Sequence, residues 1–255
     1  MYLPKLKAPI VLVHGLMGYD RLAVAGRTVV EYFRGIRQPL EESGNRVLVP
    51  CLSATAGVEQ RATELKRFLD QNANGEPVHV LAHSMGGLDA RHAITHLGLA
   101  DRVLSLTTIG TPHRGTHFAD WGLRCLEAVA KPIFQALNIP YQAFLDLTTA
   151  ACRPFNERTP NALNVRYFSV AGRCERAWLS PAWWLPHAIV SKAEGPNDGI
   201  VSVESARFGE HTDVWDGDHL NLINVLNVPM YLRGQWTDRT VLYGRLVRRL
   251  ADCGF

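Results

Sequence analysis

The strongest constraint on the fold is an alternation along the chain between short apolar runs and longer segments with helical periodicity. Apolar runs bounded by turn residues predict strands, and apolar positions three to four residues apart predict helices. The predicted strands are residues 10–13, 46–49, 78–82, 103–109 and 165–170. The predicted helices are residues 24–42, which Gly35 and Pro39 bend or divide, 58–70 and 86–96. This order indicates an α/β fold with a mostly parallel central sheet and helices on both faces.

The alternation lapses in two places. In residues 116–148 the apolar positions keep a helical spacing that Pro132 and Pro140 interrupt, which predicts a helical insertion. Residues 173–186 contain three tryptophans and two prolines and are predicted to be irregular. A length of 255 residues suits one large hydrophobic core, so residues 1–255 are expected to form a single domain.

Composition and charge exclude several classes of protein. Hydrophobic residues make up 47% and charged residues 20%, as in ordinary globular chains. The net charge of +3 is small and the basic residues are scattered, so no nucleic-acid partner is expected. The five cysteines are widely spaced without a CxxC pair, which favours neither a disulfide framework nor a zinc site, although one disulfide stays open. No apolar run reaches 18 residues, so no transmembrane segment is expected.

The first residues carry an expectation about location. The apolar run at residues 10–13 starts soon after Met1 and leaves no room for a secretory signal. If the chain is complete, it is expected in the cytoplasm. If a leader has been removed, secretion is the alternative.

One serine lies between a predicted strand and a predicted helix. The segment Ala82-His83-Ser84-Met85-Gly86 fits the pattern G-x-S-x-G, with alanine in the first small position. A serine hydroxyl is a weak nucleophile, so catalysis needs a strained turn that lifts its oxygen towards a base. An ordinary turn with a solvent-facing serine is the alternative interpretation. We take Ser84 as the predicted nucleophile.

A glycine-containing loop follows the first predicted strand. Acyl transfer needs two backbone N–H groups to stabilise the charge on the substrate carbonyl oxygen, one after the nucleophile and one from such a loop. In this chain the two donors are Met85 and, by its position in His14-Gly15-Leu16-Met17-Gly18, Leu16. The loop alone would be better interpreted as a plain glycine turn, but paired with the serine it predicts an oxyanion hole.

The base and the acid are expected downstream of Ser84, in the chain order serine, acid, histidine. His219, late in the chain within Asp218-His219-Leu220-Asn221, is the best base. Asp198 lies in the turn-forming Asn197-Asp198-Gly199, which is also a plain turn signal, and is the favoured acid because its turn would place a carboxylate at the end of a strand. Rival acids are Asp146, Asp213, Asp216 and Asp218, and the weaker base candidates are His92, His96, His113, His117, His187 and His211.

In these motifs and in several other segments, the chain resembles the bacterial true lipases of the α/β-hydrolase superfamily. The matching segments are His14-Gly15-Leu16, Tyr32-Phe33-Arg34-Gly35-Ile36, His83-Ser84-Met85-Gly86-Gly87, Gly110-Thr111-Pro112-His113-Arg114-Gly115-Thr116, Leu147-Thr148-Thr149 with Phe155-Asn156, Asn197-Asp198-Gly199-Ile200-Val201-Ser202, and Asp218-His219-Leu220. The resemblance implies an α/β-hydrolase fold. It also implies a triad of Ser84, Asp198 and His219, with Leu16 and Met85 as oxyanion donors.

The same resemblance implies that residues 116–148 form a helical lid that opens at a lipid interface, with a fixed cap as the alternative. Opening would expose an apolar patch and allow transient adsorption to lipid. The lid underside would be lined by Phe118, Trp121, Leu126, Phe134 and Phe144. The residues expected to contact the substrate are Met17, Phe118, Trp121, Phe144 and Leu220.

The lipases that the chain resembles usually hold a structural calcium ion near the catalytic histidine, through a carboxylate two residues after it. In this chain that position is the neutral Asn221, and the segment that carries the second calcium ligand in larger members is shorter. Calcium needs several oxygen ligands, several of them charged. We therefore expect no cofactor and no essential metal, although Asp213, Asp216 or Asp218 leaves a structural calcium open.

The function expected from these patterns is hydrolysis of carboxylic esters, acylglycerols in the first place, through an acyl-enzyme. The partner is then a lipid or a small ester. A short-chain carboxylesterase or an acyltransferase on the same scaffold is the alternative enzyme, since a fold does not determine its substrate. A binding protein that keeps the fold without activity is the alternative from another class.

Overall fold

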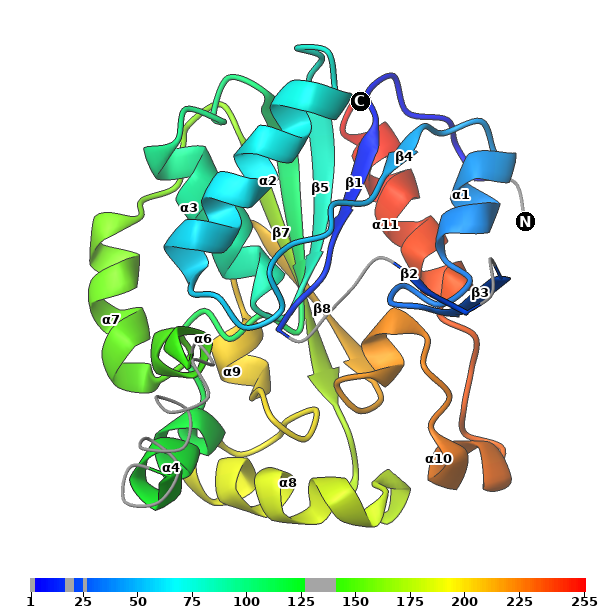
Figure 1. Cartoon of the computed structure of the whole chain (residues 1–255). Coiled ribbons are helices and arrows are strands. Elements are labelled where there is room, and N and C mark those ends of the chain that lie inside the picture. The colour runs from blue at the N-terminus through cyan, green and yellow to red at the C-terminus, as the bar shows by residue number, and fades with distance from the viewer. Residues whose placement is uncertain (1–2, 17–20, 25–26, 127–140) are drawn as a thin grey trace.

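The computed structural model describes residues 3–16, 21–24, 27–126 and 141–255. A six-stranded sheet lies at its centre, with strand order β4-β1-β5-β6-β7-β8 and every neighbouring pair parallel (Figure 1). Its strands are β1 (Ile10–Val13), β4 (Val47–Leu48), β5 (Val78–His83), β6 (Val103–Ile109), β7 (Arg166–Arg173) and β8 (His211–Asp216). The predicted mostly parallel sheet is confirmed.

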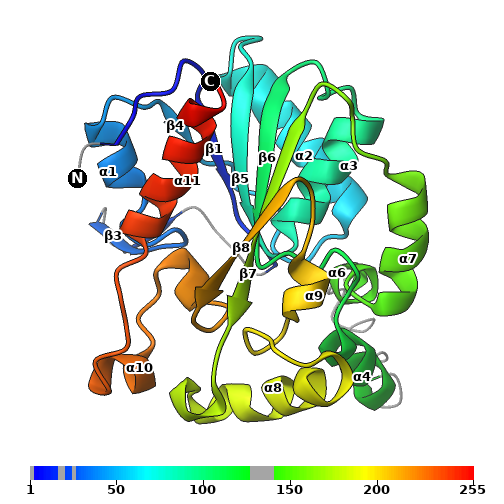
Figure 2. The same cartoon turned by 180° about the vertical axis from the view of Figure 1, so that it is seen from behind.

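Helices cover both faces of the sheet, as predicted. One face packs against α2 (Val58–Asn72) and α3 (Gly86–His96), and the other packs against α1 (Arg37–Glu42) and α11 (Thr240–Asp252) (Figures 1 and 2). Strand β1 is buried over its whole length, and its sequence is a continuous apolar run without alternation. Strand β5 is also fully buried, but it contains His79 and His83 among its apolar residues. This is why the central strands are the easiest elements to predict.

Most of the remaining helices lie towards the edge of the sheet that is formed by the carboxyl ends of the strands. In Figure 1, α4, α8 and α10 lie beyond the carboxyl ends of the strands. These helices are α4 (His117–Leu126), α6 (Gln142–Asp146), α7 (Thr149–Arg158), α8 (Pro181–Glu194), α9 (Val203–Ala206) and α10 (Val228–Leu232), with short 3₁₀ turns η1 (Arg176–Trp178) and η2 (Asn221–Ile223). The predicted helical insertion at residues 116–148 thus contains α4 and α6, while residues 127–140 lie outside the described part.

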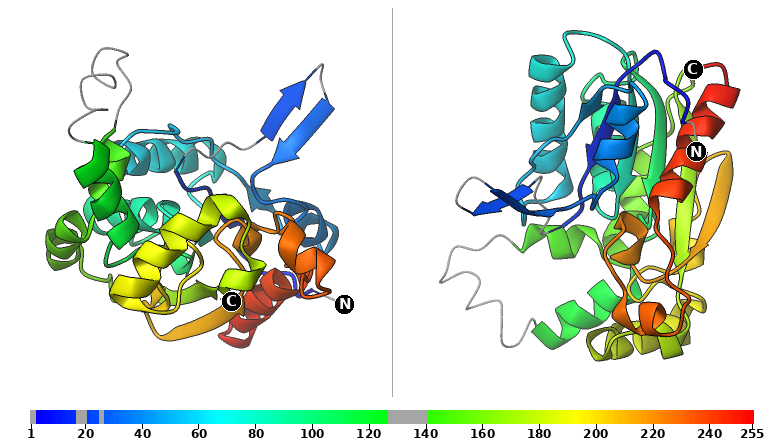
Figure 3. Two further views of the ribbon diagram at one scale, coloured as in Figure 1. Left: turned by 90° about the horizontal axis from the view of Figure 1, so that it is seen from below. Right: turned by 90° about the vertical axis from the view of Figure 1, so that its right-hand side faces the viewer.

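The predicted helix over residues 24–42 is wrong in its first half. Arg21–Val24 (β2) and Arg27–Glu31 (β3) pair as an antiparallel hairpin that projects from the rest of the molecule (Figure 3). The β-branched run Thr28-Val29-Val30 favours extended backbone. Helix α1 begins only after Gly35, which has a left-handed φ of 66°.

The prediction of an irregular segment at residues 173–186 is wrong at both ends, because β7 continues to Arg173 and α8 begins at Pro181. Between them the chain forms only the short turn η1, as expected of an irregular segment. Proline is tolerated at the first helical position, where its missing N–H would have no acceptor in the helix. Pro186 costs one further hydrogen bond, but it is buried together with Val190. Burial of this helix face therefore outweighs the local penalty.

Strand β8 is not among the predicted strands. It forms the edge of the sheet, pairs only with β7, and buries only Trp215 along its length. A strand with one neighbour and a wet face keeps polar residues, so its sequence lacks the apolar run that marks β1. Among the described helices, none is long and apolar enough to cross a bilayer.

Candidate active site

Ser84 lies at a sharp turn between β5, which ends at His83, and α3, which begins at Gly86. Its φ of 55° is left-handed, an unfavourable region for any residue with a Cβ. Two hydrogen bonds hold this conformation: the Ser84 N–H donates to the Ile109 carbonyl at 2.8 Å, and the Thr111 hydroxyl donates to the Ser84 carbonyl at 2.7 Å. The strand–turn–helix context expected from the pentapeptide is present.

The small residues of the turn are required by close backbone approaches. A Cβ on Gly86 would lie 2.7 Å from the His14 carbonyl oxygen, and one on Gly87 would lie 2.2 Å from Thr111 Oγ1. A Cβ on Gly15 would lie 2.7 Å from Ser84 Cβ. The His14–Gly15 loop and the first turn of α3 therefore meet around Ser84 with no room for side chains.

His219 and Asp198 come together next to this turn. The Nδ1 atom of His219 lies 2.7 Å from Asp198 Oδ2, and the His219 backbone N–H donates to the Asp198 carbonyl at 2.8 Å. The His219 ring centre lies 4.5 Å from that of His83, the residue before Ser84. A carboxylate on Nδ1 selects the tautomer whose Nε2 can accept a proton from a serine.

Asp198 is held by its own turn. Its Oδ1 accepts the backbone N–H groups of Ile200 at 3.1 Å and Val201 at 2.8 Å, while Oδ2 is left for His219. The turn lies between α8 and α9, and Asp198 packs on β7, where a Cβ on Gly172 would lie 2.6 Å from Asp198 Cβ. The carboxylate thus lies beside a strand end, although the residue itself belongs to a loop between helices.

The four rival carboxylates have other partners, and none bonds His219 in the part of the chain that the structure describes. Asp146 accepts the Val58 N–H at 2.7 Å and Asp218 accepts the Asn221 N–H at 2.8 Å. Asp213 and Asp216 form ion pairs with arginines, Arg249 and Arg173 respectively.

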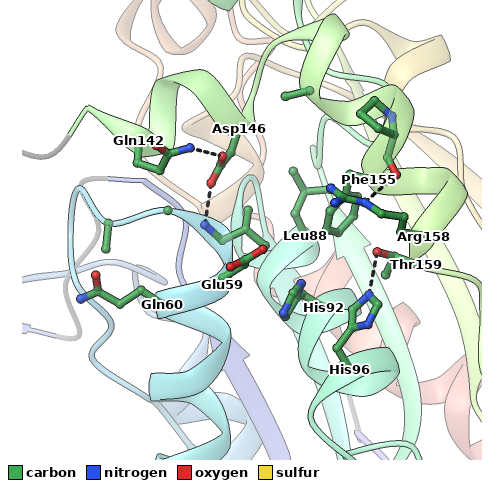
Figure 4. Close-up of a pocket in the computed structure, with 15 residues that line it drawn as sticks. Glu59, Gln60, Leu88, His92, His96, Gln142, Asp146, Phe155, Arg158 and Thr159 are labelled. Atoms are coloured by element: carbon green, nitrogen blue, oxygen red, sulfur yellow. Dashed lines mark hydrogen bonds between the residues drawn. The ribbon is translucent and has the colours of Figure 1, made fainter.

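The other candidate histidines also lie elsewhere. His92 and His96 are on α3 and line a cavity of about 840 Å³ between α2, α3, α6 and α7, whose lining does not include Ser84 (Figure 4). His113 is buried, bonded to the Thr108 hydroxyl at 2.9 Å, and burial lowers its pKa well below the usual value. The last three bond to Glu194 (His117), the Cys174 carbonyl (His187) and Asp213 (His211).

A chain of hydrogen bonds that the sequence did not predict links the loop at Gly15 to His219. The Gly15 N–H donates to the Tyr32 hydroxyl at 3.0 Å. The oxygen of this hydroxyl lies 2.7 Å from Nδ1 of His83. His83 Nε2 donates to the His219 carbonyl at 3.1 Å. Burial lowers the pKa of His83 well below its usual value, so the ring is neutral and has one donor and one acceptor nitrogen. Tyr32 and His83 both lie in segments that match the lipases, and this match was the only feature of the sequence that could have indicated their role.

The two expected oxyanion donors belong to segments that meet around Ser84, the loop after β1 and the turn before α3. Leu16 packs in one apolar cluster with Met85 and Leu88. Within the described residues, neither the Leu16 nor the Met85 backbone N–H donates to another backbone carbonyl.

A buried ion pair supports this loop from behind and was not predicted. The Arg61 guanidinium donates to the His14 carbonyl at 2.7 Å and to Asp89 Oδ2 at 2.8 Å, and both side chains are fully buried. Burial raises the pKa of Asp89 to about 7 despite the neighbouring Arg61. The pair links α2 and α3 to the His14–Gly15 loop.

The residues expected to contact the substrate are only partly described. Phe118 and Trp121 of α4 stack with ring centres 5.9 Å apart, and both are half-buried, as is Phe144 of α6. Leu220, directly after His219, is 38% exposed. Met17 and Phe134 lie outside the described residues, and of Leu126 only the place at the end of α4 is described.

The region after His219, where a structural calcium ion was left open, contains a guanidinium. The Asn221 side-chain oxygen accepts a hydrogen bond from the buried guanidinium of Arg239, which also donates to the Asp216 carbonyl. A positive charge already lies where a metal would need oxygen ligands. Among the described residues there is also no group of three or more His, Cys, Asp or Glu side chains placed to hold a metal.

A parallel sheet covered on both faces and a serine on a strained strand–helix turn are the marks of the α/β-hydrolase fold. The class that this fold and site define is a carboxylic ester hydrolase. The family described as "PGAP1-like alpha/beta domain" matches residues 58–209, more than half of the chain, and the chain belongs to that family.

Relatives over nearly the whole chain carry lipase names. Triacylglycerol lipase 2 of Saccharomyces cerevisiae is 30% identical over 94% of this chain and 87% of its own length. A triacylglycerol lipase of Vibrio cholerae is 29% identical, covering 96% of this chain and 88% of its own. The mature Bacillus licheniformis lipase BlEst2 superimposes with a TM-score of 0.70 at 25% identity, over 91% of this chain and 93% of its own. The predicted resemblance to lipases is confirmed.

Proposed function

We propose that the chain hydrolyses acylglycerol esters through an acyl-enzyme formed on Ser84. The Ser84 oxygen attacks the ester carbonyl, His219 takes the serine proton and returns it to the leaving alcohol, and Asp198 holds the imidazole and stabilises its cation. The Leu16 and Met85 N–H groups stabilise the oxyanion of the tetrahedral intermediate. Water then releases the acid by the same steps.

The observation that carries this proposal is the bond between His219 Nδ1 and Asp198 Oδ2, which is 2.7 Å long, shielded from water, and close to His83, the residue before Ser84. It supports a base whose Nε2 is oriented for a nucleophile. No step requires a metal or a redox cofactor, so full activity after EDTA treatment is part of the proposal.

The substrate class follows from the relatives and from α4. Two relatives over nearly the whole chain are named triacylglycerol lipases, and the aromatic pair Phe118 and Trp121 on α4 supports binding of an acyl chain. We propose that residues 116–148 act as a lid over this site within a single domain, and that the partner surface is lipid.

The test of the mechanism is Ser84→Ala. It is expected to lower kcat for p-nitrophenyl esters by at least about 10⁴-fold and to abolish labelling by a fluorophosphonate, because both need the serine oxygen. The matched control is Ser205→Ala, a buried serine whose hydroxyl bonds the Gly115 carbonyl and which takes no part in the mechanism. Near-wild-type turnover by Ser84→Ala would contradict the proposal.

The test of the substrate is a series of triacylglycerols and p-nitrophenyl esters from acetate to palmitate. A lipase is expected to turn over long-chain emulsions, with activity rising above the solubility limit of the substrate. Turnover restricted to dissolved short-chain esters would leave the chemistry intact and contradict the acylglycerol assignment.

A further inference from the structure

The turn that carries His219 is held at both ends by one buried side chain. The turn begins where β8 ends at Asp216 and finishes where η2 begins at Asn221. The guanidinium of Arg239, a residue 20 positions after His219, enters this turn, and its Nη2 donates to both the Asp216 carbonyl and the Asn221 side-chain oxygen. Arg239 is only 4% exposed.

Further contacts of Arg239 fix the guanidinium in this position. Its backbone N–H donates to Asn224 Oδ1 at 2.8 Å, and its Nη1 donates to the Thr237 hydroxyl at 3.1 Å. A Cβ on Gly217 would lie 2.8 Å from Nη2 and 2.3 Å from the Asn221 oxygen. Only a glycine at position 217 leaves space for the guanidinium inside the turn.

The oxygen atoms around the turn are already in use. The two carboxylate oxygens of Asp218 accept from the Asn221 N–H at 2.8 Å and from the Asn227 amide at 2.6 Å. The Asp216 carboxylate points outward to Arg173, at 2.8 Å. Burial lowers the pKa of Arg239, while the nearby Asp216 and Asp218 charges oppose that effect. The carboxylates near the turn therefore balance the charge of the guanidinium. Because their oxygens already accept hydrogen bonds or ion pairs, few of them are free to bind a divalent ion.

We propose that Arg239 is a positioning residue that serves as a built-in cation, doing for the His219 turn what a bound metal ion would do. It cross-links the two ends of the turn and thereby holds the imidazole at Asp198 and Ser84. The inference rests on the proposed role of His219 as the base. It accounts for the presence of Asn221, since a carboxylate there is not needed to bind a metal.

The first test is Arg239→Met, which removes the cation and keeps an apolar side chain of similar length. We expect kcat to fall at least about tenfold with KM within about twofold, because substrate binding is unaffected while the base is misplaced. Arg239→Lys, which keeps the charge, should recover part of the lost kcat. Arg173→Met, at the surface partner of the Asp216 carboxylate, is the control and should resemble the wild type.

Circular dichroism establishes that each variant is folded, and Arg239→Lys remains informative if Arg239→Met is not. A folded Arg239→Met with wild-type kcat would overturn the positioning role. So would a loss of kcat that Arg173→Met reproduces.

The second test asks whether the cation can be exchanged for a metal. In Asn221→Asp combined with Arg239→Met, a carboxylate replaces the amide and the guanidinium is gone, so millimolar CaCl₂ should raise Tm and increase kcat. EDTA and CaCl₂ should leave wild-type Tm unchanged. A double variant indifferent to calcium would overturn the equivalence with a metal. The Tm readout needs no turnover, so failure of the Ser84 mechanism can be told apart from failure of this inference.

Discussion

At the scale of single residues, the site requires glycine, which has no Cβ, at positions where backbone segments approach closely. A methyl group at Gly15 would lie 2.7 Å from Ser84 Cβ and 3.1 Å from the His83 carbonyl oxygen, so Gly15→Ala must displace the oxyanion loop or the nucleophile. A displacement of reacting groups by about 1 Å can lower the rate about 100-fold. We therefore expect kcat/KM for p-nitrophenyl butyrate to fall about 100-fold in this variant. Tm should change by only a few degrees.

The matched control is Gly75→Ala, in the turn before β5. Gly75 has a φ of 78°, and a Cβ there would meet nothing within 4 Å. The left-handed backbone makes alanine cost about 1 kcal/mol of stability there, while kcat/KM should stay at the wild-type value. If Gly15→Ala keeps wild-type kcat/KM, the loop does not approach Ser84 as described.

At the scale of elements, α2 and α3 are joined to the His14–Gly15 loop by the buried Arg61–Asp89 pair, 2.8 Å apart. Arg61→Met leaves a carboxylate buried without its partner, which should lower the free energy of unfolding by about 3–5 kcal/mol in urea denaturation. Arg46→Met, at an exposed pair with Glu76, should cost less than about 1 kcal/mol.

Arg61→Met combined with Asp89→Asn should recover part of that loss, because no unpaired charge is then buried. A double variant as unstable as Arg61→Met alone would mean that the loss comes from packing and not from the charge.

At the scale of the whole molecule, several buried histidines make stability depend on pH. Burial lowers the pKa of His14 and of His79 to about 4, and it lowers the pKa values of His83 and His113 well below the usual value. Between about pH 6.5 and pH 4 the unfolded chain binds protons that the folded chain does not, so stability rises with pH in this window and is lost as pH falls. Tm should drop by roughly 10 °C from pH 6.5 to 4.5.

The matched variant is His79→Gln, at a ring bonded to the Ser105 hydroxyl and distant from Ser84 along β5. It should flatten the dependence of Tm on pH by the contribution of one histidine. A wild-type Tm that is constant from pH 6.5 to 4.5 would contradict the assignment of neutral buried rings.

The elements predicted best are those buried on both sides. Strands β1 and β6 and helix α3 have the predicted bounds because burial makes their sequences rich in apolar and β-branched residues or gives them a regular apolar face. The edge strand β8 is half exposed and the β2–β3 hairpin projects from the rest of the molecule, so neither carries that signal. Pro186 lies inside a helix because its burial offsets the local penalty of proline, and a local pattern contains the penalty without the burial.

The sequence by itself determined the class of fold and the candidates Ser84, Asp198 and His219, because a nucleophile turn, its chain order and its apolar neighbours are local patterns. Only the tertiary structure decided how these residues are held. Tyr32 reaches His83 across 51 positions, Arg61 reaches Asp89 across 28, and Arg239 returns from 18 positions beyond Asn221. Such contacts depend on how distant segments pack, and no local pattern encodes the partner of a buried polar group.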